Sequence, residues 1–135
     1  MTHLLDTSAL LAHYRKEPGF QTVHQILIEP VNTLAISVIS ILELHSRLKE
    51  LGETESRRRE IIEDYLKLVT AMPVTETIVR RAVELKEKCP DRLPTVDSLI
   101  AATSLVENAI LVHRDKHMAQ IPAAVAKQVN LFECT

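Results

Sequence analysis

The chain has 135 residues, a length that suits one domain and is too short for two ordinary ones. Its 46% apolar and 25% charged residues are typical of a folded globular protein, which argues against disorder. A formal net charge of −2 excludes a general polycationic wrap around nucleic acid, and two glycines are too few for a Gly-rich phosphate-binding loop.

The N-terminal half alternates short apolar runs with helical periodicity. An apolar stretch leads to Asp6 and predicts a strand, and Thr7 or Ser8 is placed to cap the helix that follows. Apolar residues spaced three and four apart predict further helices, and one β-leaning apolar run predicts a buried strand. The expected elements are a strand within residues 3–6, helices over 9–13 and 20–28, a strand over 33–37 and a helix over 38–51.

The C-terminal half begins with a charged helical segment, predicted over 53–70. The other expected elements are a helix over 75–88, a helix over 95–108 capped by Thr95, a strand over 109–113, a turn over 116–121 and a strand over 128–132. Short apolar strands separated by helices predict βαβ units. We therefore expect a single α/β domain over residues 1–135, a doubly wound, largely parallel sheet with helices on both faces.

The two cysteines, Cys89 and Cys134, lie far apart without CxxC spacing, so we expect neither a thiolate zinc site nor a disulfide scaffold. No apolar run approaches the roughly 20 residues that span a bilayer, and the N-terminus lacks the basic region of a signal peptide. These features predict a protein of the reducing cytoplasm.

Four acidic residues stand where such a fold places a binding site. Asp6 directly follows the first strand, and Asp115 comes two residues after the next-to-last strand. Open parallel sheets bind ligands outside the carboxyl ends of their strands. Glu43 lies in the helix after the second strand and Asp97 in the first turn of the 95–108 helix, and both helices follow or face the same end of the sheet.

The surroundings of these acids predict a metal ion. Asp6, Glu43 and Asp97 lie within apolar segments, where an unpaired ionised carboxylate is costly and neighbouring carboxylates raise each other's pKa. No Lys or Arg is adjacent to any of the three in sequence. A divalent cation such as Mg²⁺ or Mn²⁺, which prefers carboxylate oxygens, is the economical partner, and it supports phosphodiester hydrolysis.

Four segments carry a resemblance to a known family: LLDTSALL, AISVISILELHSRL, TVDSLIAATSL and ILVHRDKHM. In order and spacing they resemble the motifs of PIN-domain proteins, and the chain is similar in length to the VapC toxins of type II toxin–antitoxin modules. The resemblance covers essentially the whole chain. It implies a PIN-like fold and an endoribonuclease that depends on Mg²⁺ or Mn²⁺, forms a homodimer and is held inactive by a cognate antitoxin whose tail occupies the cleft.

The family's acidic quartet of metal-binding and catalytic residues is matched by Asp6, Glu43, Asp97 and Asp115. Thr7 and Ser8 fill its small hydroxyl positions, and Ser8 is expected to orient a carboxylate or a metal-bound water. The family usually has Thr or Ser where this chain has His113, and often a second Asp and then Phe where it has His117 and Met118. His113 is expected either to donate to a phosphate or to shape the cleft, and the number of metal ions stays open.

Three of the acids also have a structural explanation when each is taken alone. Asp6 would cap the first helix, Asp97 would interact with a helix dipole, and Asp115 would be a turn residue. Glu43, considered below, is the fourth acid with a structural explanation. Four such coincidences in the family's order are improbable, which favours the metal site.

The structural explanation of Glu43 depends on where its helix begins. A start at Ser40 would make Glu43 part of a capping box. A start at Ser37 would place Glu43 well inside the helix, and the continuous apolar face from Val38 onward favours this second alternative.

Among the remaining polar residues, Arg47 and Arg114 are candidate substrate contacts, since each lies close in sequence to one of the four acids. The Arg57-Arg58-Arg59 run is flanked by glutamates and is expected to be solvated. Tyr14 and Phe20 are too few to form a stacking platform, so the sequence indicates no base-specific recognition.

Two other functions are alternatives to the nuclease. A catalytically silent PIN-like module that binds RNA or protein would not need the intact quartet. A receiver-like phospho-acceptor domain needs paired acids after its first strand and an acceptor Asp after its middle strand, but Asp6 stands alone and segment 33–37 carries no acid. For a homodimer, the exposed parts of helices 38–51 and 53–70 are the expected interface.

Overall fold

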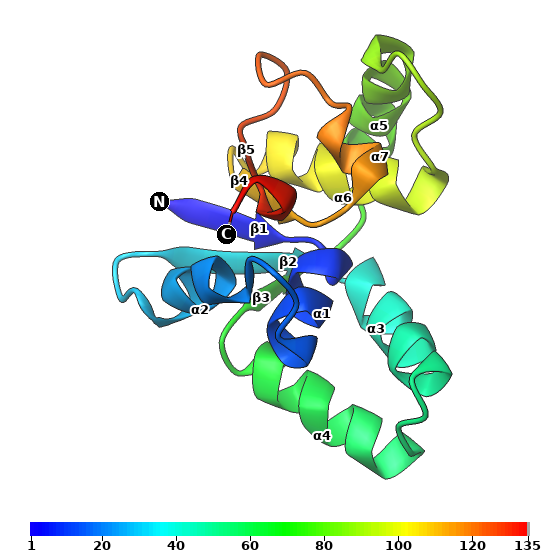
Figure 1. The fold of residues 1–135 in the computed structure, drawn as a ribbon. Helices are drawn as coiled ribbons and strands as arrows, with labels where there is room; N and C mark the ends of the chain where they lie inside the picture. Colours follow the sequence, from blue (N-terminus) through cyan, green and yellow to red (C-terminus); the bar gives the residue numbers. More distant parts are fainter. Residues whose placement is uncertain (135) are drawn as a thin grey trace.

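The protein, described over residues 1–134 by a computed structural model, contains a parallel sheet of five strands in that range. In chain order the strands are β1 (Thr2–Leu5), β2 (Thr33–Ser37), β3 (Thr70–Met72), β4 (Ile110–His113) and β5 (Gln128–Asn130). Their order across the sheet is β3-β2-β1-β4-β5, and each neighbouring pair is parallel. The predicted doubly wound parallel sheet is confirmed, with β1 at its centre (Figure 1).

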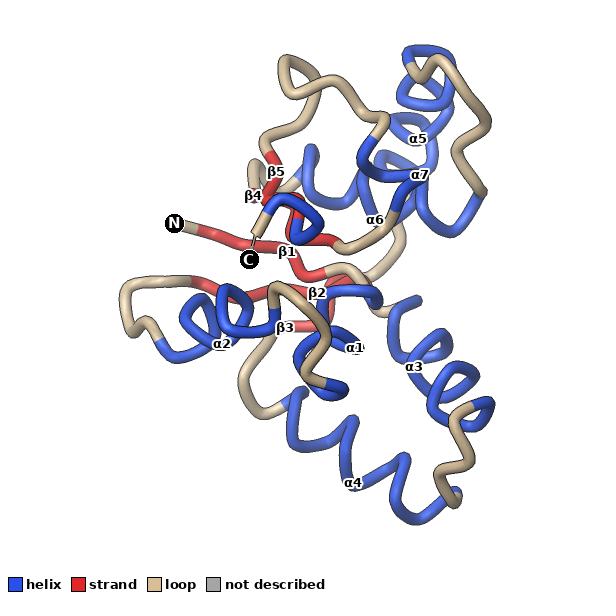
Figure 2. Tube along the Cα trace, viewed as in Figure 1, coloured by secondary structure: helices blue, strands red, loops and turns tan. Residues whose placement is uncertain are grey.

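Helices cover both faces of this sheet (Figures 1 and 2). One face carries α1 (Thr7–Arg15), α2 (Phe20–Ile28), α3 (Ile39–Glu50) and α4 (Glu55–Leu66). The other carries α5 (Glu76–Lys88), α6 (Thr95–Val106) and the short α7 (Lys116–Ala119). A 3₁₀ turn, η1 (Leu131–Glu133), follows β5. Within residues 1–134, no helix combines the length and apolar character that crossing a membrane requires.

Side-chain alternation along the central strands produces two cores. Because successive residues of a strand point to opposite faces, Leu5 and Val112 pack in the core under α1–α4, whereas Leu4 and Leu111 pack in the core under α5 and α6. All four side chains are fully buried. Strands buried on both faces carry continuous apolar runs, which explains why β1 and β4 were recognisable in the sequence.

The helix predicted over 53–70 is wrong in its last four residues. Helix α4 ends at Leu66, and after a turn the chain forms β3, which pairs with β2 through Ile36 and Ala71. The three residues of this edge strand are too few to show alternation, and the apolar residues before them fit a helix equally well. The strand is fixed by its ladder to β2, a long-range interaction that the local pattern does not contain.

Most other boundaries lie within two residues of the prediction, and two of the differences have a clear local cause. Thr95 is the first residue of α6 rather than its cap; Pro94 holds the cap position and provides no side-chain hydrogen bond. The last strand ends at Asn130 instead of continuing to 132, because the Asn130 side chain accepts a hydrogen bond from the Phe132 N–H and turns the chain into η1.

Candidate metal centre at the carboxyl ends of the strands

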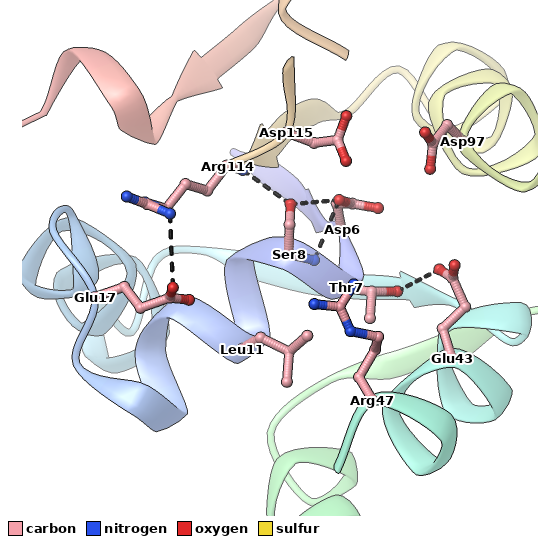
Figure 3. Close-up of a pocket in the computed structure, with 10 residues that line it drawn as sticks. All are labelled: Asp6, Thr7, Ser8, Leu11, Glu17, Glu43, Arg47, Asp97, Arg114 and Asp115. Atoms are coloured by element: carbon pink, nitrogen blue, oxygen red, sulfur yellow. Dashed lines mark hydrogen bonds and ion pairs between the residues drawn. The ribbon is translucent and has the colours of Figure 1, made fainter. Parts of the chain in front are cut away.

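A pocket at the carboxyl ends of the central strands brings the four predicted acids together (Figure 3). Asp6 follows β1, Asp115 lies beyond the end of β4, and Glu43 and Asp97 come from α3 and α6 on opposite faces of the sheet. The cavity has a volume of about 180 Å³. Its lining consists of five acids, two arginines and three other residues: Asp6, Glu17, Glu43, Asp97, Asp115, Arg47, Arg114, Thr7, Ser8 and Leu11.

Asp6 is the most deeply buried acid of the pocket, with only 3% of its surface exposed. It is the N-cap of α1, which confirms the capping role considered for Asp6 and corrects the prediction of Thr7 or Ser8 as the cap. Its Oδ2 accepts hydrogen bonds from the Ser8 N–H at 3.2 Å and from the Ser8 hydroxyl at 2.5 Å. Burial raises the pKa of Asp6 to about 6, opposed by the Ser8 hydrogen bonds and reinforced by the charges of Glu43 and Asp115. Asp6 therefore caps the helix, and its ionised form is destabilised by burial and by the neighbouring carboxylates.

Glu43 is oriented by Thr7, whose hydroxyl donates a hydrogen bond of 2.7 Å to Glu43 Oε1. The same hydroxyl lies 3.1 Å from the Ser40 hydroxyl. Helix α3 begins at Ile39, after Val38, so Glu43 is inside the helix and the capping-box alternative is wrong, although the start at Ser37 was two residues early. Ser8 was expected to orient a carboxylate; the structure shows that Thr7 does so as well.

Asp97 lies half-buried in the first turn of α6. Burial raises its pKa to about 7, and the charges of Asp115, Asp6 and Glu43 act in the same direction. The structure therefore shows that the four carboxylates interact electrostatically across the pocket. Within residues 1–134 none of the four forms an ion pair with a lysine, arginine or histidine, so no protein cation offsets their charge directly.

The four carboxylates line the pocket without converging on one metal position. Within the described chain, no three His, Cys, Asp or Glu side chains are clustered tightly enough to surround one metal ion directly. Mg²⁺ usually keeps several waters and is held by one or two carboxylates, whereas Ca²⁺ needs six to eight oxygen ligands. Carboxylates spread around a small polar pocket are therefore compatible with Mg²⁺ or Mn²⁺, and the residues that could hold it are Asp6, Glu43, Asp97 and Asp115.

Asp115 caps α7, since its Oδ1 accepts hydrogen bonds from the backbone N–H groups of His117 at 2.7 Å and Met118 at 3.3 Å. The explanation of Asp115 as a turn residue is thus correct in part, but its side chain also lines the pocket (Figure 3). Met118 is fully buried, and His117 is absent from the pocket lining.

His113 is fully buried and does not line the pocket, so the expectation that it donates to a phosphate is wrong. Its Nδ1 accepts from the Asp115 N–H at 3.3 Å, which leaves Nε2 to donate to Gln128 Oε1 at 2.8 Å. Burial lowers the pKa of His113 and favours this neutral form. His113 therefore shapes the cleft by supporting the backbone of Asp115, the second of the two expected roles.

Both predicted arginines line the pocket, on different sides of it (Figure 3). Arg47 is exposed on α3 and pairs with Glu50 at 3.4 Å. Arg114 is held more firmly, by Glu17 at 3.6 Å and by a hydrogen bond from its Nε to the Pro18 carbonyl at 3.3 Å. The arginines of the 57–59 run lie on α4, outside this pocket.

Glu17 is a pocket residue that the sequence did not indicate. It follows the end of α1 and belongs to none of the motifs, and its contact with Arg114 joins segments far apart in the chain. Ser8 makes a second link between the same segments, because its hydroxyl accepts a hydrogen bond of 2.9 Å from the Arg114 N–H. Only the folded arrangement reveals this wall of the pocket.

Comparisons with known proteins agree with the fold. No curated protein matches the chain by sequence. Among solved structures, the chain is similar to VapBC2 from Rickettsia felis bound to a promoter DNA fragment (TM-score 0.78, 22% identity, covering 96% of this chain and 98% of that one). It is also similar to VapBC-1 from nontypeable Haemophilus influenzae (TM-score 0.75, 21% identity, covering 98% of this chain and 100% of that one). A third similar structure is VapBC-5 from Mycobacterium tuberculosis (TM-score 0.68, 21% identity, covering 96% of this chain and 98% of that one). The PIN domain family model matches residues 3–124, and the chain belongs to the PIN domain family.

Proposed function

We propose that this protein is an endoribonuclease that depends on Mg²⁺ or Mn²⁺ and acts as the toxin of a type II toxin–antitoxin pair. The observation that carries the proposal is that four carboxylates, from four separate segments, line one small pocket and that none of them forms an ion pair within residues 1–134. Membership of the PIN domain family supports the nuclease chemistry. The fold shared with VapBC-5, a member of a family of toxin–antitoxin systems, supports the biological role.

The residues of the pocket have distinct tasks in this reaction. A bound divalent ion would supply positive charge for the phosphate and make a nearby water more acidic. Asp6 and Asp97 have pKa values near neutrality, so the cluster accepts a proton readily; the four interacting carboxylates do this as a unit, and no single one is assigned as the base. Thr7 and Ser8 orient Glu43 and Asp6 through their hydroxyl groups.

The two arginines at the pocket supply the positive charge that an RNA strand needs. Guanidinium groups bind phosphate oxygens with directed hydrogen bonds and position the backbone without reading sequence. Arg47 and Arg114 line different sides of the acidic pocket, so phosphates on either side of the scissile bond would each meet a cation.

A cognate antitoxin and a second copy of the chain are the proposed protein partners. Contiguous exposed apolar side chains mark sites of association. Helix α3 and its ends expose Val38, Leu42 and Leu51, and Leu68 is exposed after α4. These residues belong to the surface that the sequence suggested for a homodimer.

Cleavage of structured RNA by the purified chain tests the enzymatic part of this proposal. We expect fragments with Mn²⁺, none with EDTA, and a loss of at least about a hundredfold in rate for Asp6→Asn, because the site loses a charge that the cation needs. The exposed Asp91, outside the pocket, provides a matched control, and Asp91→Asn should cleave at the wild-type rate. RNA binding without metal-dependent cleavage would refute the nuclease and indicate the silent binding module.

A further inference from the structure

An exposed aromatic ring lies beside the acidic pocket. The chain has two Phe, two Tyr and no Trp, and of the Phe and Tyr rings, all of which the structure describes, only that of Phe132 is largely open to solvent, at 50% exposure. Tyr14 and Tyr65 are partly buried, and their hydroxyl groups bond to Glu53 and His13. The sequence pointed to other aromatic residues and overlooked this one.

Phe132 is connected to the pocket through Arg114. The Arg114 guanidinium lies over the Phe132 ring, 4.8 Å from its centre, at a distance typical of a cation–π contact. Arg114 also lines the pocket and is restrained by Glu17 and Pro18. We call this arrangement of Arg114 on Phe132 the Arg–Phe shelf.

The backbone holds the shelf in place from both sides. Asn130 fixes Phe132 through a hydrogen bond of 3.0 Å to its N–H. On the other side, the turn between α1 and α2 packs directly on Leu131, where Gly19 has φ +96° and an added Cβ would lie 3.0 Å from both Leu131 Cβ and its carbonyl oxygen. Glycine at 19 therefore allows the segment that holds Arg114 to meet the segment that carries Phe132.

The pocket is too small to hold a nucleobase together with its phosphate, so the bases of a bound RNA strand must lie outside it. At about 180 Å³ the cavity is smaller than the roughly 300–1,000 Å³ of typical ligand pockets, so it has room for a phosphate and water but not for a whole nucleotide. A base attached to a phosphate in the pocket must therefore lie outside, along the rim. At the Arg114 side of the rim, the exposed surface is an aromatic ring with a cation against it.

We propose that the Arg–Phe shelf binds one unpaired nucleobase of single-stranded RNA next to the phosphate that is cleaved. The base stacks on the exposed part of Phe132, and Arg114 binds the neighbouring phosphate, so Phe132 is a positioning residue. Stacking on an aromatic side chain tolerates any base, because each has a π face, but it excludes a base that is already stacked within a duplex. The inference rests on the proposed function in taking RNA as the molecule that crosses the pocket.

Tryptophan fluorescence tests the shelf without any need for cleavage. Because the chain has no Trp, Phe132→Trp introduces a single tryptophan at the shelf, whose emission can be excited apart from that of the two tyrosines. Val31→Trp introduces one at an exposed position before β2, at the opposite ends of the strands. With EDTA present, a short oligoadenylate should quench the emission of Phe132→Trp and leave that of Val31→Trp unchanged. A ribose-phosphate strand of equal length without bases should quench neither.

Binding affinities provide the second readout. Phe132→Ala should weaken the binding of oligoadenylate about 5- to 150-fold, the effect of losing one stacked base, and leave binding of the baseless strand unchanged. Phe132→Tyr should bind like the wild type. Absence of base-dependent quenching, or equal losses for both strands in Phe132→Ala, would overturn the shelf.

Different results would refute the nuclease and the Arg–Phe shelf, so the two proposals can be tested independently. Base-dependent quenching without Mn²⁺-dependent cleavage would support the shelf and refute the nuclease. Mn²⁺-dependent cleavage by the wild type, together with an unchanged affinity of Phe132→Ala for oligoadenylate, would support the nuclease and overturn the shelf.

Discussion

Replacing Asp6 by asparagine separates the charge of this residue from its role as a helix cap. Asparagine caps helices as well as aspartate does, so the hydrogen bonds from Ser8 to the Asp6 Oδ2 position can be kept. What disappears is a carboxylate that is 3% exposed and faces the charges of Glu43 and Asp115. Without a divalent cation, we therefore expect Asp6→Asn to be more stable than the wild type at neutral and alkaline pH.

The pKa of Asp6 determines the size and the sign of this effect. It rises from the ordinary value of 3.8 to about 6 in the folded protein. Folding therefore takes up a proton between these pH values, and wild-type stability falls as the pH rises through them. At about 1.4 kcal/mol per pKa unit the penalty above this range is about 3 kcal/mol, which for a chain of this length corresponds to a gain of about 10 °C in the Tm of the variant.

Thermal unfolding in EDTA, measured from acidic to alkaline pH, checks this prediction. The two proteins should have similar Tm values near about pH 3, where the Asp6 carboxyl is protonated in both states. Their Tm values should diverge between about pH 4 and pH 6, and the difference should stay constant above about pH 6. Mg²⁺ should raise the Tm of the wild type, with about 2.7 kcal/mol of stabilisation at 100 times its Kd, and have much less effect on Asp6→Asn. A variant less stable than the wild type at alkaline pH would show that Asp6 is a structural cap and refute the reasoning.

Three further substitutions test other parts of the structure. Thr7→Val removes the hydroxyl that donates to Glu43 and should lower RNA cleavage about 10- to 100-fold, whereas Thr7→Ser should keep it; equal rates in both would contradict the role of Thr7. His113→Leu leaves the Gln128 amide oxygen without its donor and should cost about 1–3 kcal/mol in urea unfolding near pH 8. Because burial lowers the pKa of His113, wild-type stability from this residue falls as the pH drops below 6.5, so the difference should narrow near about pH 5; a constant difference would argue against the burial effect. Gly19→Ala and Gly52→Ala both place a side chain at positive φ, which should lower the free energy of unfolding by about 1–2 kcal/mol. Only the Cβ of Gly19→Ala meets Leu131, so this variant should lose about 1 kcal/mol or more beyond the loss in Gly52→Ala. Equal losses in the two variants would show that the contact with Leu131 relaxes freely.

The centre of the fold could be predicted because its strands are buried on both faces. Leu4 and Leu5 face opposite cores, as do Leu111 and Val112, so both strands appear as unbroken apolar runs. Once the strands were known, the rule that ligands bind at their carboxyl ends placed Asp6 at the site. The resemblance to PIN-domain motifs then placed the acids that lie on helices.

The elements that were missed depend on long-range pairing or on the exact register of a cap. Strand β3 is three residues long and exists through its ladder to β2, which no local pattern reports. Thr7 and Ser8 are good capping residues, yet Asp6 takes the cap because β1 ends one residue earlier and leaves Asp6 extended. Local propensity could not decide between adjacent candidates.

The rim of the site was the least predictable part. Glu17, Arg114 and Phe132 meet only because the turn after α1 packs on η1, a contact between the two ends of the chain. His113 was singled out by its position in a motif, but its side chain points into the core and supports Asp115 from behind. Sequence position therefore identified the loop and its pocket residues Arg114 and Asp115 correctly, but it did not show that the His113 side chain is buried.

Calorimetric titration with Mn²⁺ tests most directly whether the four carboxylates act together as a metal site. The wild type should bind Mn²⁺ in the absence of RNA, and each of Asp6→Asn, Glu43→Gln, Asp97→Asn and Asp115→Asn should bind it at least about 10-fold more weakly, while Asp91→Asn binds it as tightly as the wild type. Undiminished binding in all four pocket variants, or no binding by the wild type, would contradict the account.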